Sequence, residues 1–274
     1  MEPKVALRTG GGDDVNIAFK NPGFEYSVDS ILLFQTDDMT PYWSEALTYF
    51  YPEVDAAELR RRGAAGRREY LLEALWPAWQ AVEGELEAKV LAYGAHFALH
   101  RPQIEAALSE AFGTDTGALF NDLTANITLN PICPRFLIER RFDLFCKNSE
   151  RGALGMSLHE MIHYLWFHVW HAEFSDGYDE YETPSLKWIL SEMVVESIMR
   201  DERLSSINPY FPRENGGCVY DYFQNMQLDG ESALAAIDRM YGQCGMREFM
   251  HRAYAYCLGH ESAIRAHIDK EEKG

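Results

Sequence analysis

The chain reads Met156-Ser157-Leu158-His159-Glu160-Met161-Ile162-His163-Tyr164-Leu165-Trp166 near its middle. At about 100° per residue, the apolar side chains of this stretch and of its continuation to Trp170 cover nearly the whole circumference of a helix. A helix that is apolar all round is buried, so we expect a core helix here. Buried histidine and glutamate side chains without partners would be costly, and the motif therefore needs a partner of its own.

The two histidines are spaced to bind a single metal ion. His159 and His163 lie four residues apart, so they point within about 40° of each other on one helix face. Their imidazoles can reach one ion from that face. Glu160 falls beside the ion rather than on it, where a carboxylate can take a proton from metal-bound water.

A second helix downstream offers a third ligand. Thr183-Pro184 is predicted to be its N-cap and first residue, and the apolar run 186–199 is strongly helical. Glu192 and Glu196 lie one turn apart on its apolar face, where a positive charge must meet them. We predict Glu192 as the third ligand and Glu196 as the acceptor that orients a ligand histidine through its other ring nitrogen. The reverse assignment stays open, as do salt bridges to Arg200 or Arg252.

The rest of the chain predicts a mostly helical α+β fold. Residues 1–112 form a mainly helical N-terminal region, in which 31–34 are a strand or a docked segment and helical patterns begin at 41. Residues 113–274 form a second domain that opens with two short strands, 125–129 and 142–145. Prolines after the first strand indicate that it lies at a sheet edge.

The motif resembles the zincin metallopeptidases, in particular the gluzincin branch, in which HExxH is followed by a glutamate on a second helix. His159, Glu160, His163 and Glu192 match the ligand, base, ligand and ligand of that branch, over about residues 126–203. The match is partial, because Glu196 stands where thermolysin-like members have aspartate. The resemblance implies that 113–274 is a zincin-like catalytic domain with a Zn²⁺ cofactor.

The activity implied by the resemblance is zinc-dependent hydrolysis of peptide bonds, with a peptide or protein as substrate. Zincins place an edge strand before the motif helix, where an extended peptide can add as another strand, and residues 126–130 suit that role. Such a hydrolase also needs a group that stabilises the developing oxyanion. The loop-like segment 204–222 and the last helical stretch offer Tyr220 first and His251 second.

Other functions are also compatible with these residues. The protein could be a non-catalytic binding protein of zincin fold that retains a metal, although a structural site has no use for the base Glu160. It could also be another metal-dependent amide hydrolase of deformylase type, with Cys133 or Cys146 as a ligand, or could bind iron or manganese. His168 and His171 are near enough in sequence to be rival ligands.

Composition excludes several classes. The formal charge of −18 repels the phosphates of nucleic acids, so we do not expect nucleic acid as a partner. No apolar run is long enough to span a membrane, and the first residues lack the apolar core of a signal peptide, which favours a cytoplasmic protein. The five cysteines contain no CxxC pair, which argues against a disulfide framework or a zinc knuckle.

Overall fold

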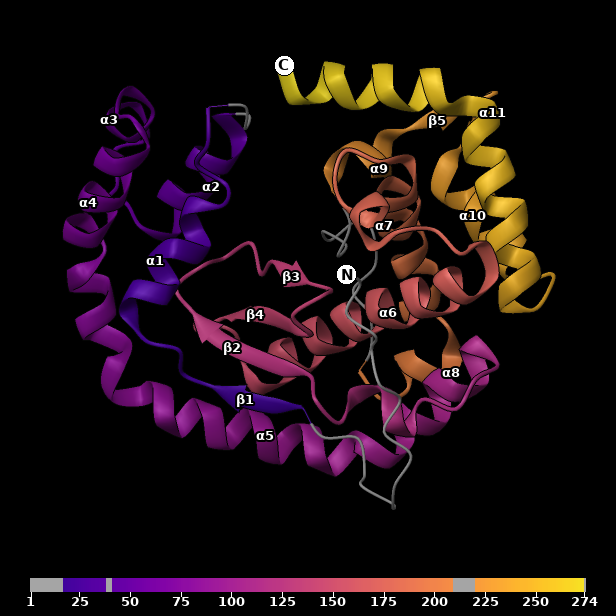
Figure 1. Cartoon of the computed structure of the whole chain (residues 1–274), viewed down its shortest axis with the longest axis horizontal. Helices are drawn as coiled ribbons and strands as arrows, with labels where there is room; N and C mark the ends of the chain where they lie inside the picture. Colours follow the sequence, from indigo (N-terminus) through magenta and orange to yellow (C-terminus); the bar gives the residue numbers. More distant parts are fainter. Residues whose placement is uncertain (1–16, 38–40, 209–219, 274) are drawn as a thin grey trace, which may run out of the picture.

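The computed structural model describes residues 17–37, 41–208 and 220–273, and its fold is α+β and mostly helical, as predicted (Figure 1). The strands are β1 (Ala18–Lys20), β2 (Thr124–Thr128), β3 (Arg135–Phe136), β4 (Arg141–Phe145), β5 (Gln227–Leu228) and β6 (Glu231–Ser232). The helices are α1 (Phe24–Leu32), α2 (Pro41–Phe50), α3 (Ala56–Arg61), α4 (Ala64–Ala74), α5 (Trp76–Phe112), α6 (Glu150–Phe174), α7 (Leu186–Met199), α8 (Glu202–Ser205), α9 (Asp221–Asn225), α10 (Ala233–Tyr241) and α11 (Met246–Lys273), with short 3₁₀ turns η1 (Gly117–Phe120) and η2 (Tyr178–Tyr181).

The main sheet has the strand order β1-β2-β4-β3. β1, β2 and β4 run parallel, whereas β3 pairs antiparallel with β4 through the register Arg135↔Phe142. The two strands predicted from alternation are confirmed as β2 and β4. The prediction that the first of them is an edge strand is wrong, because β1 pairs with residues 124–126 on the side of β2 that faces away from β4. The edge beside the motif helix is β3 instead.

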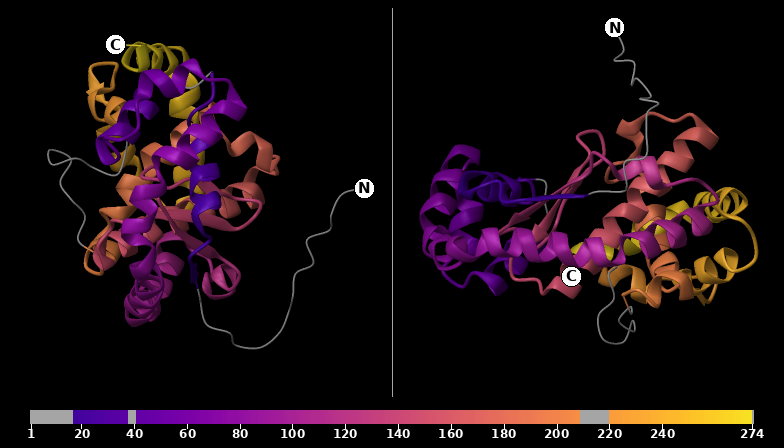
Figure 2. Two further views of the ribbon diagram at one scale, coloured as in Figure 1. Left: turned by 90° about the vertical axis from the view of Figure 1, so that its left-hand side faces the viewer. Right: turned by 90° about the horizontal axis from the view of Figure 1, so that it is seen from below.

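The N-terminal region shares one hydrophobic core with the rest of the chain. The predicted boundary coincides with the end of α5, where Gly113 adopts a φ of +63° in the left-handed region that favours glycine. However, β1 belongs to the main sheet, α5 contacts both β1 and α6, and a single cluster of buried side chains runs from Ile17 to Ile264. Figure 2 shows from below how α5 runs along the rest of the molecule.

Residues 31–34 do not form a strand; the end of α1 covers the first two of them. The buried face of this helix consists of Ser27, Val28, Ser30 and Ile31. Its two serines are polar, so the apolar pattern was too short to indicate a helix. Both are buried because they bind polar groups of the sheet rather than apolar side chains.

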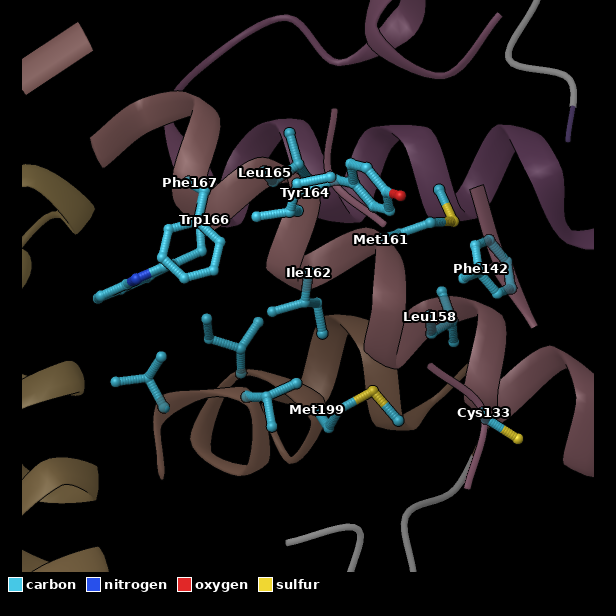
Figure 3. Close-up of a cluster of buried hydrophobic side chains, with 14 of the residues drawn as sticks. Cys133, Phe142, Leu158, Met161, Ile162, Tyr164, Leu165, Trp166, Phe167 and Met199 are labelled. Atoms are coloured by element: carbon cyan, nitrogen blue, oxygen red, sulfur yellow. The ribbon is translucent and has the colours of Figure 1, made fainter. Parts of the chain in front are cut away.

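The motif helix α6 is the centre of the core. Ser149 caps its start, where the side-chain oxygen accepts a hydrogen bond from the backbone N–H of Gly152 at 3.1 Å. Figure 3 shows its side chains Leu158, Met161, Ile162 and Trp166 leaving the helix in different directions. They meet neighbours on several elements, because α6 contacts α5, α7, α11 and β4. The predicted buried helix is therefore confirmed.

The second predicted helix, α7, is buried without interruption from Ile189 to Met199. Its N-cap is Ser185 rather than Thr183, because the Ser185 hydroxyl accepts the backbone N–H of Trp188 at 3.1 Å. The helix packs against α6, α10 and α11. This packing places the carboxylate of Glu192 opposite His159 and His163 of α6.

Among the described residues, no helix is long and apolar enough to cross a membrane. Cys133, Cys146, Cys244 and Cys257 are free thiols, and three of them are buried. The prediction that these cysteines form no disulfide framework is met for the part of the chain that the structure describes.

A buried polar network fastens α1 to the sheet. Asp143 on β4 is fully buried, and its carboxylate accepts hydrogen bonds from the hydroxyls of Tyr26 and Ser30. The Tyr26 hydroxyl also accepts from Asn126 at 2.9 Å and from Arg141. Burial raises the pKa of Asp143, so these donors are what keep a carboxylate tolerable there.

Replacing Tyr26 with phenylalanine should destabilise the protein, because a buried carboxylate loses a donor and Asn126 loses an acceptor. We expect a loss of about 1–3 kcal/mol in the free energy of unfolding, measured by urea denaturation. Tyr49→Phe is the matched control, since the Tyr49 side chain is exposed. Equal unfolding midpoints for the two variants would contradict a stabilising role of the network.

Candidate metal centre

Packing of α6 against α7 brings three ligand atoms together. The Nε2 atoms of His159 and His163 lie 3.0 Å apart, and Oε2 of Glu192 is 3.5 Å from the His163 Nε2 and 4.0 Å from the His159 Nε2. Relative exposures are 6% for His159, 0% for His163 and 4% for Glu192. Among the described residues, these three form the one group of histidine, cysteine and acidic side chains that could hold a metal ion.

The spacing of the three atoms fits a metal ion. Zinc binds histidine nitrogen and carboxylate oxygen at about 2.0–2.2 Å, so ligands at the corners of a tetrahedron lie about 3.4 Å from each other. The observed separations of 3.0, 3.5 and 4.0 Å surround that value. A small tetrahedrally coordinated cation therefore fits between these side chains.

The protonation states also suit a cation. Burial lowers the pKa of His159 to about 3, with a further contribution from His163, and burial together with Arg135 lowers the pKa of His163. Both imidazoles are therefore neutral at pH 7 and have a lone pair to donate. Burial opposes ionisation of Glu192, but the permanently charged Arg135 beside it favours the carboxylate, and the pKa of Glu192 is lowered overall. The donor set is two neutral imidazoles and a carboxylate.

Glu160 lies beside this group without belonging to it. Its Oε1 is 3.9 Å from the Nε2 of His159, and its Oε2 has no hydrogen-bond partner within the described ranges. The side chain is almost fully buried, and burial raises its pKa to about 8. This is the place that the motif predicts for a base.

Arg135 completes the centre and was missed by sequence reasoning. Its Nη1 donates to Oε1 of Glu192 at 2.8 Å, and the two side chains are only 9% and 5% exposed. The alternative partners named from sequence lie elsewhere, because Arg200 pairs with Asp238 and Arg252 with Gln243. No sequence signal marks Arg135, since its position depends on the pairing of β3 with β4.

Glu196 is fully buried but does not orient a ligand histidine. The Nδ1 atoms of His159 and His163 both lack a hydrogen-bond partner among the described residues. The role predicted for Glu196 is therefore not seen in this structure. Of the two carboxylates, the structure places that of Glu192 near both Nε2 atoms, so Glu192 is the one in the group that could hold a metal ion.

The two residues proposed for oxyanion stabilisation lie in different places. Tyr220 packs its ring 5.6 Å from that of Trp188, which is one turn before Glu192, and 6.0 Å from that of Trp43. His251 pairs with Glu173 at 2.8 Å, which lies about 15 Å beyond His163 along α6. The structure thus places Tyr220 against Trp188 of the ligand helix α7 and separates His251 from the centre. Residues 209–219 of the predicted loop lie outside the described residues.

The rival ligands do not join the group. His168 is exposed, and Nδ1 of His171 contacts the backbone oxygen of Asp176 at 2.7 Å. Cys133 and Cys146 are both buried, and burial raises the pKa of each thiol, to about 11 for Cys146. Neither sulfur belongs to the group of described side chains that could hold a metal ion, so the cysteine arrangement of a deformylase is not found among the described residues.

Comparison of the chain with protein-family models, with curated proteins and with solved structures found no match.

Removal of His163 should abolish metal binding, because a site with one imidazole and one carboxylate holds zinc weakly. We expect His163→Ala to lose the one equivalent of zinc retained by the wild type after desalting, measured by elemental analysis. His168→Ala is the matched control on the same helix and should keep the metal. Full zinc occupancy in His163→Ala would show that the ion lies elsewhere.

Proposed function

We propose that the protein is a zinc-dependent metallohydrolase of gluzincin type that cleaves peptide bonds. The observation that carries the proposal is the convergence of His159 Nε2, His163 Nε2 and Glu192 Oε2, with the Glu160 carboxylate beside them. Two neutral imidazoles and one carboxylate are the ligand set of many catalytic zinc sites.

The composition of the site favours hydrolysis. Two histidines and a carboxylate can also bind iron in oxygenases. The base Glu160 inside the motif has a role in hydrolysis but none in oxygenation. Three protein ligands also leave a coordination position for a small molecule, whereas structural zinc sites use four protein ligands. When bound, zinc would supply a Lewis acid that lowers the pKa of water and polarises a carbonyl group.

The chain's own residues supply the proton transfer. Glu160, whose pKa burial raises to about 8, would be ionised when the charge of a bound cation lies beside it; it would then take the proton of the attacking water and return it to the leaving amine. Tyr220, beside Trp188, is the candidate that stabilises the oxyanion. His251 has no part in this proposal, because it lies on α11 and contacts Glu173 near the C-terminal end of α6, away from the histidines.

A peptide substrate is suggested by the zincin resemblance and by the position of β3. This edge strand carries Arg135, which contacts Glu192, so the strand borders the proposed centre. An extended peptide that pairs with an exposed edge places its own backbone along the strand. The docking role predicted for 126–130 therefore passes to β3.

A second candidate is a non-catalytic protein that retains a metal. The deep burial of His163, which is 0% exposed, and of its neighbours favours this candidate, because a catalytic ion must be reached by substrate. The two candidates differ in whether the zinc-loaded protein hydrolyses anything at all.

Glu160→Gln should separate metal binding from catalysis. The zinc content should stay at the wild-type level, because Glu160 is not a ligand, while hydrolysis of a mixed pool of fluorogenic peptides should fall by about 10²–10⁴-fold. Glu173→Gln, near the exposed end of the same helix, is the matched control and should leave the rate unchanged.

Equal rates for Glu160→Gln and the wild type would rule out Glu160 as the base. A wild-type protein that binds zinc but cleaves no peptide of the pool would favour the non-catalytic candidate.

A further inference from the structure

The guanidinium of Arg135 divides the two carboxylate oxygens of Glu192 between two partners. Nη1 of Arg135 is 2.8 Å from Oε1, whereas Oε2 faces the histidines, 3.5 Å from the Nε2 of His163. Oε1 therefore accepts the hydrogen bond from Arg135, and Oε2 is the oxygen directed at the histidines. A carboxylate without such a restraint can bind a metal through one oxygen or through both.

We propose that Arg135 is a positioning residue that makes Glu192 a one-oxygen ligand and serves as its counter-ion until the metal binds. The inference rests on the metal site proposed above. A charge-assisted hydrogen bond at Oε1 fixes the plane of the carboxylate and occupies the oxygen that would otherwise turn toward the ion. The coordination position that a second oxygen would take then stays open.

Burial strengthens this restraint. The side chains of Arg135 and Glu192 are 9% and 5% exposed, so water screens their attraction little. Removing one partner of a buried pair leaves the other charge uncompensated, which is strongly destabilising. In the metal-free protein, Arg135 is the cation that contacts Glu192.

The remaining donors of the Arg135 guanidinium indicate a functional role for this side chain. Its Nε and Nη2 are buried without hydrogen-bond partners in the described part of the chain, although the ring of Phe167 lies 5.9 Å from the guanidinium carbon. Buried donors are nearly always satisfied in proteins, and exceptions concentrate at functional sites. Among the described residues, the hydrogen bond that the Arg135 guanidinium makes is the one from Nη1 to Oε1 of Glu192.

Cobalt(II) in place of zinc tests the coordination directly, because its visible absorption is strong with four ligands and weak with five. The full chain is compared as wild type, Arg135→Met and Arg135→Lys. Arg200→Met is the matched control, since Arg200 caps α7 but pairs with Asp238 away from the site. We expect Arg135→Met to bind one cobalt and to lose most of the visible absorption, as Glu192 swings to bind through both oxygens.

Arg135→Lys should restore the strong absorption, because an ammonium group can still donate to Oε1. The second readout is unfolding. Metal-free Arg135→Met should unfold at a lower temperature than Arg200→Met, and zinc should raise its midpoint by more than it raises that of the wild type, since the metal replaces the missing counter-charge.

The outcomes are distinct. A wild-type protein that binds neither cobalt nor zinc contradicts the metal site and the proposed function with it. A wild type that binds cobalt, with an unchanged spectrum in Arg135→Met, overturns the present inference alone. If Arg135→Met folds only with metal, the spectrum is taken on protein refolded with cobalt. Arg135→Met could also fail to fold with cobalt while the double variant Arg135→Met/Glu192→Gln folds. The metal would then be unable to replace the charge of Arg135, and the inference would be wrong.

Discussion

Ionisable side chains buried between α6 and α7 constrain the whole structure. His159, Glu160, His163 and Glu192 are at most 6% exposed, and each would be costly to bury alone. The cost falls only when both helices and β3 meet, because Arg135 on β3 supplies the positive charge that Glu192 needs. Three segments far apart in sequence are thereby tied to one relative arrangement.

The N-terminal region supports the same arrangement through the sheet. Tyr26 and Ser30 of α1 bind the carboxylate of Asp143 on β4, and the backbone N–H of Asp143 donates to the oxygen of Pro134 at 2.9 Å. Pro134 directly precedes Arg135. Hydrogen bonds therefore connect α1 through Asp143 to the backbone next to Arg135, and the buried apolar cluster also spans both predicted domains.

Sequence patterns correctly predicted the features that depend only on residues close together in the chain. The spacing of His159 and His163, the apolar faces of α6 and α7 and the alternation in β2 and β4 each lie within a few turns or one strand. The pairing of β1 with β2, the edge position of β3 and the burial of the serines on α1 depend on distant contacts. Arg135 belongs to this second group, because the pairing of β3 with β4, and not a local pattern, brings its guanidinium to Glu192.

The counter-ion Arg135 has a consequence for the proposed metal site. Small zinc domains are unfolded without their ion, because their ligands have no other partners. Here Glu192 already has Arg135, and the neutral His159 and His163 contact each other through their Nε2 atoms. The fold therefore does not need the ion to compensate its buried charge. A cation that is not required for folding can be held through a single oxygen of Glu192 and keep a position open, which is the arrangement that a hydrolytic site requires and a structural site does not.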